Sequence, residues 1–216
     1  ELASLKVNKV QDRSINSSKA VEFLQEEANK KGLDWHVKEG ENLASKAYHM
    51  VARKTLYIKK GEFFSKKDLE RFSIHELGVH ATRGFNGLKQ KYKIFFIGTA
   101  EYEPTEEGLA TVMEEKHGLL ENNVLRSYSG RVLAVHLSLT KSFREVYNEL
   151  VKLFPKEKAY NLTLRAKRGL KDTSLPGAFT KDHIYLKGRE EVKKLKDVSP
   201  LFIGKVAIED LPLLQT

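Results

Sequence analysis

The sequence predicts an α+β fold that is mainly helical, with one small β-sheet near its beginning. Bulky and β-branched residues cluster before Gly40 and before Gly61, which is typical of short strands. Apolar residues recur at helical spacing through most of the remaining chain. No internal repeat or long linker interrupts the 216 residues, and 40% of them are hydrophobic. Residues 1–216 are therefore expected to form one domain with a buried core.

Residues 17–32 are expected to form the first helix, with a serine as its N-cap and Gly32 as its stop. The segments LDWHVKEG and AYHMVARKTLYIKKG follow and predict the strands of the sheet. We expect TLYIKK, at residues 55–60, to be an edge strand.

Two helices with recognisable ends come next. The sequence SKKD at 65–68 is a capping box and predicts a helix that continues through LERFSIHELGVHATRGFNG. The segment EPTEEGLATVMEEKHG predicts a second helix, with Thr105 as its N-cap and Gly118 as its C-terminal stop. Residues 139–154 and 156–169 have apolar faces of helical period, and SLPGAFTKD predicts a loop before another basic helix.

The helix that begins after SKKD carries the motif HExxxH, which is formed by His75, Glu76 and His80. Residues five apart on a regular α-helix point roughly 140° away from each other, so the two imidazoles could not share a metal ion. A single π-turn takes up the extra residue and returns both rings to one side. Gly78 lowers the steric barrier to such a distortion. The motif therefore predicts a π-bulge or an equivalent distortion between the two histidines.

A catalytic zinc ion takes three protein ligands and leaves a fourth position for water. The chain has no cysteine, so the third ligand must be a histidine or a carboxylate. Glu107 is the best candidate, because Gly108 and Ala110 let its helix approach the first helix closely. Glu106 points elsewhere and is the weaker choice. Glu114 lies on the same face as Glu107. It is expected either to hydrogen-bond a metal-binding histidine from outside or to replace Glu107 as a ligand.

With one Zn²⁺ held in this way, Glu76 is expected to act as general base and then as general acid in peptide hydrolysis. The alternative is a pair of buried histidines that bind no metal. The remaining histidines lack ligand-like spacing and are expected in the core or on the surface: His36, His49, His117, His136 and His183.

The charge is unevenly distributed along the chain. Residues 156–205 hold 13 basic and 6 acidic residues, an excess of seven within a net charge of +9. A basic face favours an acidic partner, which could be nucleic acid, an anionic surface or an acidic peptide tail, and a solvated lysine-rich surface is an equal alternative. Of these partners we expect a protein or peptide, such as an acidic C-terminal tail, rather than nucleic acid or a membrane. No apolar run is long enough to cross a membrane and no signal peptide is recognisable, so a cytoplasmic setting is expected.

Three segments in order, HELGVHATRGFNG, TEEGLA and RGLKDTSLPGAFTKDHIYLKG, resemble the HExxxH zinc metallopeptidases with a QEGLA motif, the family of the tubulin-detyrosinating tyrosine carboxypeptidases. The resemblance covers most of residues 45–190. It implies a zincin-like catalytic domain over 1–216, with His75, His80 and Glu107 as zinc ligands and Glu76 as the catalytic residue. This chain departs from the motif where Glu106 replaces its glutamine.

The resemblance also implies a carboxypeptidase, which needs a cation for the C-terminal carboxylate of its protein or peptide substrate. Candidates are Arg168, Lys181 and Tyr185 in the family-like stretch, and Arg83, one turn beyond His80. Two alternatives stay open, a zinc endopeptidase with the same site and a non-catalytic module that binds acidic partners.

Overall fold

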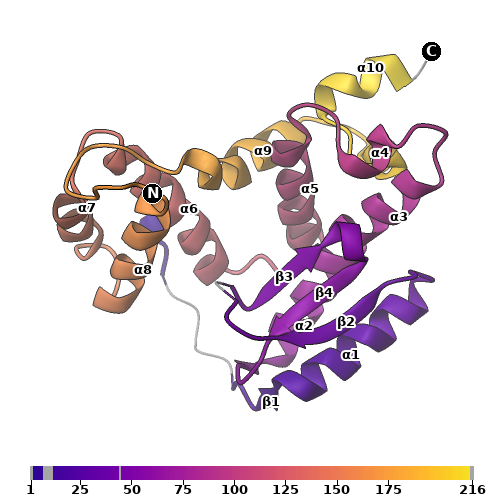
Figure 1. Ribbon diagram of the computed structural model, residues 1–216, viewed down its shortest axis with the longest axis horizontal. Coiled ribbons are helices and arrows are strands. Elements are labelled where there is room, and N and C mark those ends of the chain that lie inside the picture. The colour runs from indigo at the N-terminus through magenta and orange to yellow at the C-terminus, as the bar shows by residue number, and fades with distance from the viewer. Residues whose placement is uncertain (1, 7–11, 44, 215–216) are drawn as a thin grey trace. The chain divides into compact units, whose positions relative to one another are not determined.

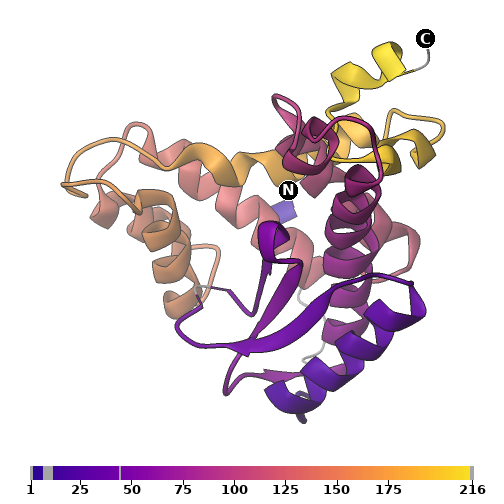
Figure 2. The same cartoon turned by 45° about the vertical axis from the view of Figure 1, so that its right-hand side comes forward.

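The computed structural model describes residues 2–6, 12–43 and 45–214 (Figure 1). Its contacts divide the chain into two compact units, Glu1–Lys9 with Leu120–Lys187, and Val10–Leu119 with Gly188–Thr216. Helices predominate and the strands are short and few, so the predicted mainly helical α+β class is confirmed (Figure 2). That residues 1–216 act as one catalytic domain stays a prediction.

The N-terminal half of the second unit is a small α/β layer. Helix α1 (Ser17–Lys30) is capped by Asn16, whose side chain accepts from the Lys19 amide at 3.0 Å; the predicted serine cap was wrong by one residue. A two-stranded ladder joins β1 (Ile15–Asn16) to β5 (Phe63–Phe64).

A three-stranded sheet follows, in the order β2 (His36–Gly40), β4 (Thr55–Lys59) and β3 (Ala47–Met50). Strand β4 pairs in parallel with β2 and antiparallel with β3. The prediction that TLYIKK is an edge strand was therefore wrong. Its buried Leu56 and Ile58 suit a central strand, and β3 and β2 form the edges.

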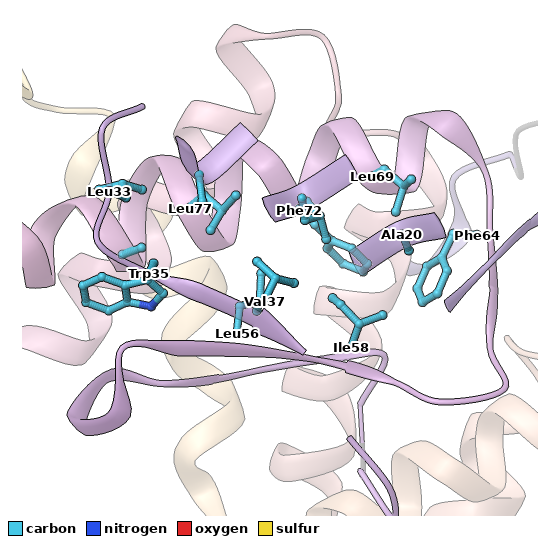
Figure 3. Packing of buried hydrophobic residues seen from close by; sticks show 13 residues of the cluster. Ala20, Leu33, Trp35, Val37, Leu56, Ile58, Phe64, Leu69, Phe72 and Leu77 are labelled. Atoms are coloured by element: carbon cyan, nitrogen blue, oxygen red, sulfur yellow. The ribbon is translucent and has the colours of Figure 1, made fainter. Parts of the chain in front are cut away.

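The core of this layer lies between the sheet, α1 and the helix that carries the HExxxH motif. Trp35, Leu56, Ile58, Phe72 and Leu77 are all buried and pack in one cluster (Figure 3). Because Leu77 belongs to the motif itself, the motif's backbone is fixed against the sheet by close packing.

The motif helix has three parts: α2 (Lys66–Phe72), the π-helical segment η3 (Ser73–Ala81) and α3 (Thr82–Leu88). The predicted capping box is confirmed, because Ser65 and Asp68 bond each other's backbone amides at 3.1 and 3.0 Å.

Helix α5 (Tyr102–Lys116) begins one turn earlier than predicted. Glu101 precedes it in a left-handed conformation with φ of 56°, so Thr105 is not the N-cap. Thr105 is instead buried inside the first turns, where its hydroxyl accepts from the Ile208 amide at 3.0 Å. Gly118, with φ of 69°, follows the helix as predicted.

Gly108 in α5 meets α9 (Ile184–Val192) at Gly188, rather than the motif helix as predicted. A Cβ at Gly108 would lie 2.1 Å from the carbonyl carbon of Gly188, and one at Gly188 would lie 1.8 Å from the oxygen of Pro104. Ala110 does pack beside Val79 of the motif helix. The chain continues through η5 (Ser199–Ile203), η6 (Ile208–Asp210) and α10 (Leu211–Leu214), and α4 (Ile94–Ile97) also lies in this unit.

The first unit is helical, as the apolar periodicity predicted. Its elements are η1 (Leu2–Ser4), α6 (Asn122–Ser138), α7 (Phe143–Leu150), α8 (Lys156–Lys167) and η4 (Thr180–His183). Its core includes Ala134, Val146, Leu150 and Leu162. Among the residues described, no helix has the length and apolar character needed to cross a membrane.

Candidate metal centre

The π-helical segment brings the two motif histidines to one side of the helix. The ring centroids of His75 and His80 lie 4.9 Å apart. The segment spans nine residues, and the Thr82 hydroxyl donates to the carbonyl of Leu77 at 2.8 Å, one residue further back than in an α-helix. The predicted distortion is confirmed, and it extends over more than one turn.

Glu107 of α5 faces both rings. Its Oε2 atom lies 3.5 Å from His75 Nε2 and 3.8 Å from His80 Nε2, and one ligand atom from each residue lies within 4.8 Å of the others. Tetrahedral zinc with bonds of about 2.1 Å separates its ligand atoms by about 3.4 Å. Glu107 Oε2 is buried with no hydrogen-bond partner in the described chain, as expected of an atom that binds a cation. The donor set therefore fits a zinc ion.

A buried carboxylate holds the far side of each imidazole. His75 Nδ1 lies 2.7 Å from Glu114 Oε1, which also accepts from Arg71 Nη1 at 3.0 Å. This is the outer-partner position predicted for Glu114. The bond fixes the ring so that its Nε2 faces Glu107.

The second imidazole is held in a way that the sequence did not reveal. His80 Nδ1 lies 3.2 Å from Glu106 Oε1, and both Glu106 oxygens accept from Lys205 Nζ at 2.9 Å. Glu106 does point away from the metal position, as predicted, and its carboxylate instead contacts His80 and orients that ring. Lys205 lies 99 residues further along the chain, and no local pattern links it to the motif.

The electrostatics follow from this pairing of imidazoles with carboxylates. Burial lowers the pKa of His75, but the nearby carboxylates of Glu107 and Glu114 outweigh burial and raise the pKa to about 10. Burial raises the pKa of Glu106, but His80 and Lys205 bring it well below its usual range. The pKa of Glu107 is likewise lowered by both histidines against the effect of its burial. The site is thus built to keep carboxylates ionised beside cations.

Glu76 lies next to this cluster with its side chain 14% exposed. Its Oε2 atom is 4.0 Å from Nδ1 of His49, which reaches the site from β3. Burial, followed by the charge of His80, lowers the pKa of His49 well below its usual value. His49 had been expected outside the site, because a residue 26 positions before His75 has no recognisable ligand spacing.

Arg83 is placed in the core rather than at a substrate site. Its side chain is fully buried, and its guanidinium donates to the carbonyl oxygens of Leu201 and Gly204 at 2.9 Å and of Val206 at 2.6 Å. These bonds tie the motif helix to the C-terminal segment. This arrangement supports a structural role for Arg83, and its role in binding a substrate carboxylate stays a prediction.

The other predicted substrate residues lie in the first unit. Arg168 Nη2 is 3.6 Å from Asp182 Oδ1, and its guanidinium covers the ring of Phe179. Tyr185 stacks on Tyr128 with ring centroids 4.9 Å apart. Lys181 is exposed on η4.

Two imidazoles and one carboxylate face a single position, with the Glu76 carboxylate beside them, and this arrangement could hold one metal ion in the way that mononuclear metallohydrolases do. The sequence model of the microtubule-associated tyrosine carboxypeptidase family matches residues 1–216. The chain belongs to that family.

Known relatives support this membership. The chain is 33% identical to human microtubule-associated tyrosine carboxypeptidase 1 over 159 residues, which cover 68% of this chain and 33% of the relative. The rat protein of the same name is 33% identical over 160 residues, with the same coverage. The chain thus spans about a third of the length of these relatives.

Proposed function

We propose that this protein is a zinc carboxypeptidase that removes a residue from the C-terminus of a protein or peptide. The convergence of His75, His80 and Glu107 on one position carries the proposal. The names of the relatives supply the reaction class and suggest tyrosine as the residue removed.

A bound zinc ion would polarise the scissile carbonyl and make a water molecule more acidic. His75, His80 and Glu107 would hold the ion, while Glu114 and Glu106 keep the two imidazoles oriented. Glu76 takes a proton from the attacking water and delivers it to the leaving amine. The partial burial of Glu76 limits competition from bulk water for its carboxylate.

We infer that the substrate backbone pairs with edge strand β3 rather than with TLYIKK, which is already paired on both sides. Strand β3 carries His49 beside Glu76, so a peptide added along this edge would run next to the general base. Residues 55–60, which were predicted to form an edge strand, leave no open edge for a substrate.

An acidic substrate tail is proposed to bind a basic and aromatic cluster in the first unit, formed by Arg131, Arg168, Lys181, Tyr128 and Tyr185. The guanidinium of Arg131 covers both tyrosine rings, 5.4 Å and 4.9 Å from their centroids. In the described chain no carboxylate is paired with Arg131. A cation held on aromatic faces with no carboxylate partner is ready to bind a carboxylate from outside.

The proposal is tested with peptides that end in tyrosine, each with a free or an amidated C-terminus, and the products are identified by mass spectrometry. A carboxypeptidase releases free tyrosine from the first peptide and leaves the second intact. Internal cleavage of both would establish the endopeptidase alternative. Glu76→Gln should keep the zinc and lose turnover by about a hundredfold or more; full activity of that variant would remove Glu76 from the mechanism.

The tail site is tested separately with Arg131→Ala, and with Arg144→Ala as a control on the neighbouring helix α7. We expect Arg131→Ala to raise KM for an acidic tail while leaving KM for a neutral peptide unchanged. An equal effect of both substitutions would show that only the overall charge matters.

A further inference from the structure

His49 lies beside the metal cluster with one nitrogen unused. Its ring centroid is 5.9 Å from that of His80, and its side chain is 8% exposed. Its Nδ1 atom is buried with no hydrogen-bond partner in the described chain, and Glu76 Oε2 lies 4.0 Å away. A buried polar atom without a partner next to a reaction centre needs an explanation.

Trp35 determines which nitrogen of His49 carries the proton. The indole Nε1 of Trp35 lies 2.8 Å from His49 Nε2. An indole N–H can only donate, so Nε2 must accept, and a neutral imidazole that accepts at one nitrogen carries its proton at the other. His49 therefore presents an Nδ1–H toward Glu76. Trp35 is 2% exposed and packed in the core, so the direction of this donor is fixed by the fold.

We propose that His49 is a positioning residue, which donates its Nδ1–H to Glu76 Oε2 and holds the carboxylate in the orientation required for proton transfer. The proposal rests on the proposed function, since it takes Glu76 as the general base. Oε1 of Glu76 then remains for the attacking water. No proton moves to or from His49 during the reaction.

The observed separation is compatible with this role. Catalytic hydrogen bonds are often long before substrate binds and shorten in the reacting complex. Closing from 4.0 Å to about 3 Å is within reach of a rotation of the Glu76 side chain. The same geometry excludes His49 as a metal ligand, because one nitrogen accepts from Trp35 and the other is protonated.

The first test compares His49→Leu with His49→Asn. The leucine variant fills the space without a donor, whereas the asparagine amide places an N–H near the position of Nδ1. We expect kcat of His49→Leu to fall about ten- to a hundredfold with KM and zinc content unchanged, as for the loss of a hydrogen bond to a charged group. His49→Asn should recover most of that loss. His36→Leu, on the exposed face of the other edge strand β2, should leave kcat unchanged.

The second test asks whether His49 acts through Glu76. In a Glu76→Gln background, His49→Leu should cause no further loss of kcat, because the group that it positions is already removed. An additive loss, or equal kcat for His49→Leu and wild type, would overturn the proposal.

A third measurement needs no turnover. Nitrogen-15 NMR of the imidazole in the zinc-loaded protein should report His49 protonated at Nδ1, and protonation at Nε2 would refute the role. If the wild type cleaves no peptide, the proposed function is wrong. The NMR measurement still tests independently whether His49 carries its proton at Nδ1.

Discussion

Gly108→Ala tests the closest helix contact beside the metal centre. The new methyl carbon would lie 2.1 Å from the carbonyl carbon and 2.3 Å from the carbonyl oxygen of Gly188, and 2.7 Å from the Arg189 amide nitrogen. These are backbone atoms, so no side chain can turn aside, and α5 or the segment around Gly188 must shift. Overpacking of this kind costs about 1–3 kcal/mol, and three backbone clashes place this case at about 3 kcal/mol.

Replacing a helical glycine by alanine returns about 1 kcal/mol through helix propensity, so the net loss of unfolding free energy is about 2 kcal/mol. For a chain of this size that corresponds to a fall in Tm of about 4–8 °C. Thermal unfolding followed by circular dichroism measures the fall. Because Glu107 is adjacent to Gly108, zinc affinity measured by chelator competition should fall as well.

Gly78→Ala is the matched control, since it makes the same substitution within the motif helix. The nearest atom to its new Cβ is the Ser73 carbonyl oxygen at 3.3 Å, which requires only a small adjustment. Because the gain in helix propensity is opposed only by this small adjustment, we expect Tm to be unchanged or slightly higher and zinc affinity to be unchanged. If Gly108→Ala also unfolded at the wild-type temperature, the close contact between Gly108 and Gly188 would not limit the stability of the fold.

Three further substitutions test the supports of the site. Glu114→Ala removes the partner of His75 Nδ1 and should weaken zinc binding about 10- to 100-fold in chelator competition; unchanged affinity would count against its orienting role. Lys205→Met leaves buried Glu106 with His80 as its remaining partner and should cost about 3–5 kcal/mol of unfolding free energy, measured by urea titration; wild-type stability would show that Glu106 does not depend on Lys205. Arg83→Leu leaves buried carbonyls unpaired and should lower Tm. A raised KM at unchanged Tm would restore its predicted role in substrate binding.

The sequence alone was sufficient to predict features that depend on residues close together in the chain. The capping box and the five-residue spacing of the two histidines involve neighbours in the chain, and both predictions are confirmed. The spacing was informative because a regular α-helix would point the two rings in different directions. Only a distorted helix lets both imidazoles bind one ion. Glu107 was chosen because Gly108 and Ala110 were expected to let its helix approach the first helix closely. Oε2 of Glu107 does face both rings, although Gly108 packs against Gly188 instead.

The parts that were missed depend on contacts between distant segments. His49 and Lys205 reach the site from a strand and from a C-terminal turn, and neither has a periodic relation to the motif. Arg83 was proposed as a cation for the substrate carboxylate because sequence shows its charge but not the carbonyl oxygens that surround it. The order of the strands was likewise hidden, because central and edge strands differ in partners more than in composition.

The proposed function depends on His75, His80 and Glu107 holding one zinc ion. A crystal structure with diffraction recorded on both sides of the zinc absorption edge tests it most directly. We predict one anomalous peak at about 2.0–2.2 Å from the Nε2 atoms of both histidines and from a Glu107 oxygen. No peak between these residues in zinc-supplemented crystals, or a zinc ion held elsewhere, would contradict the account.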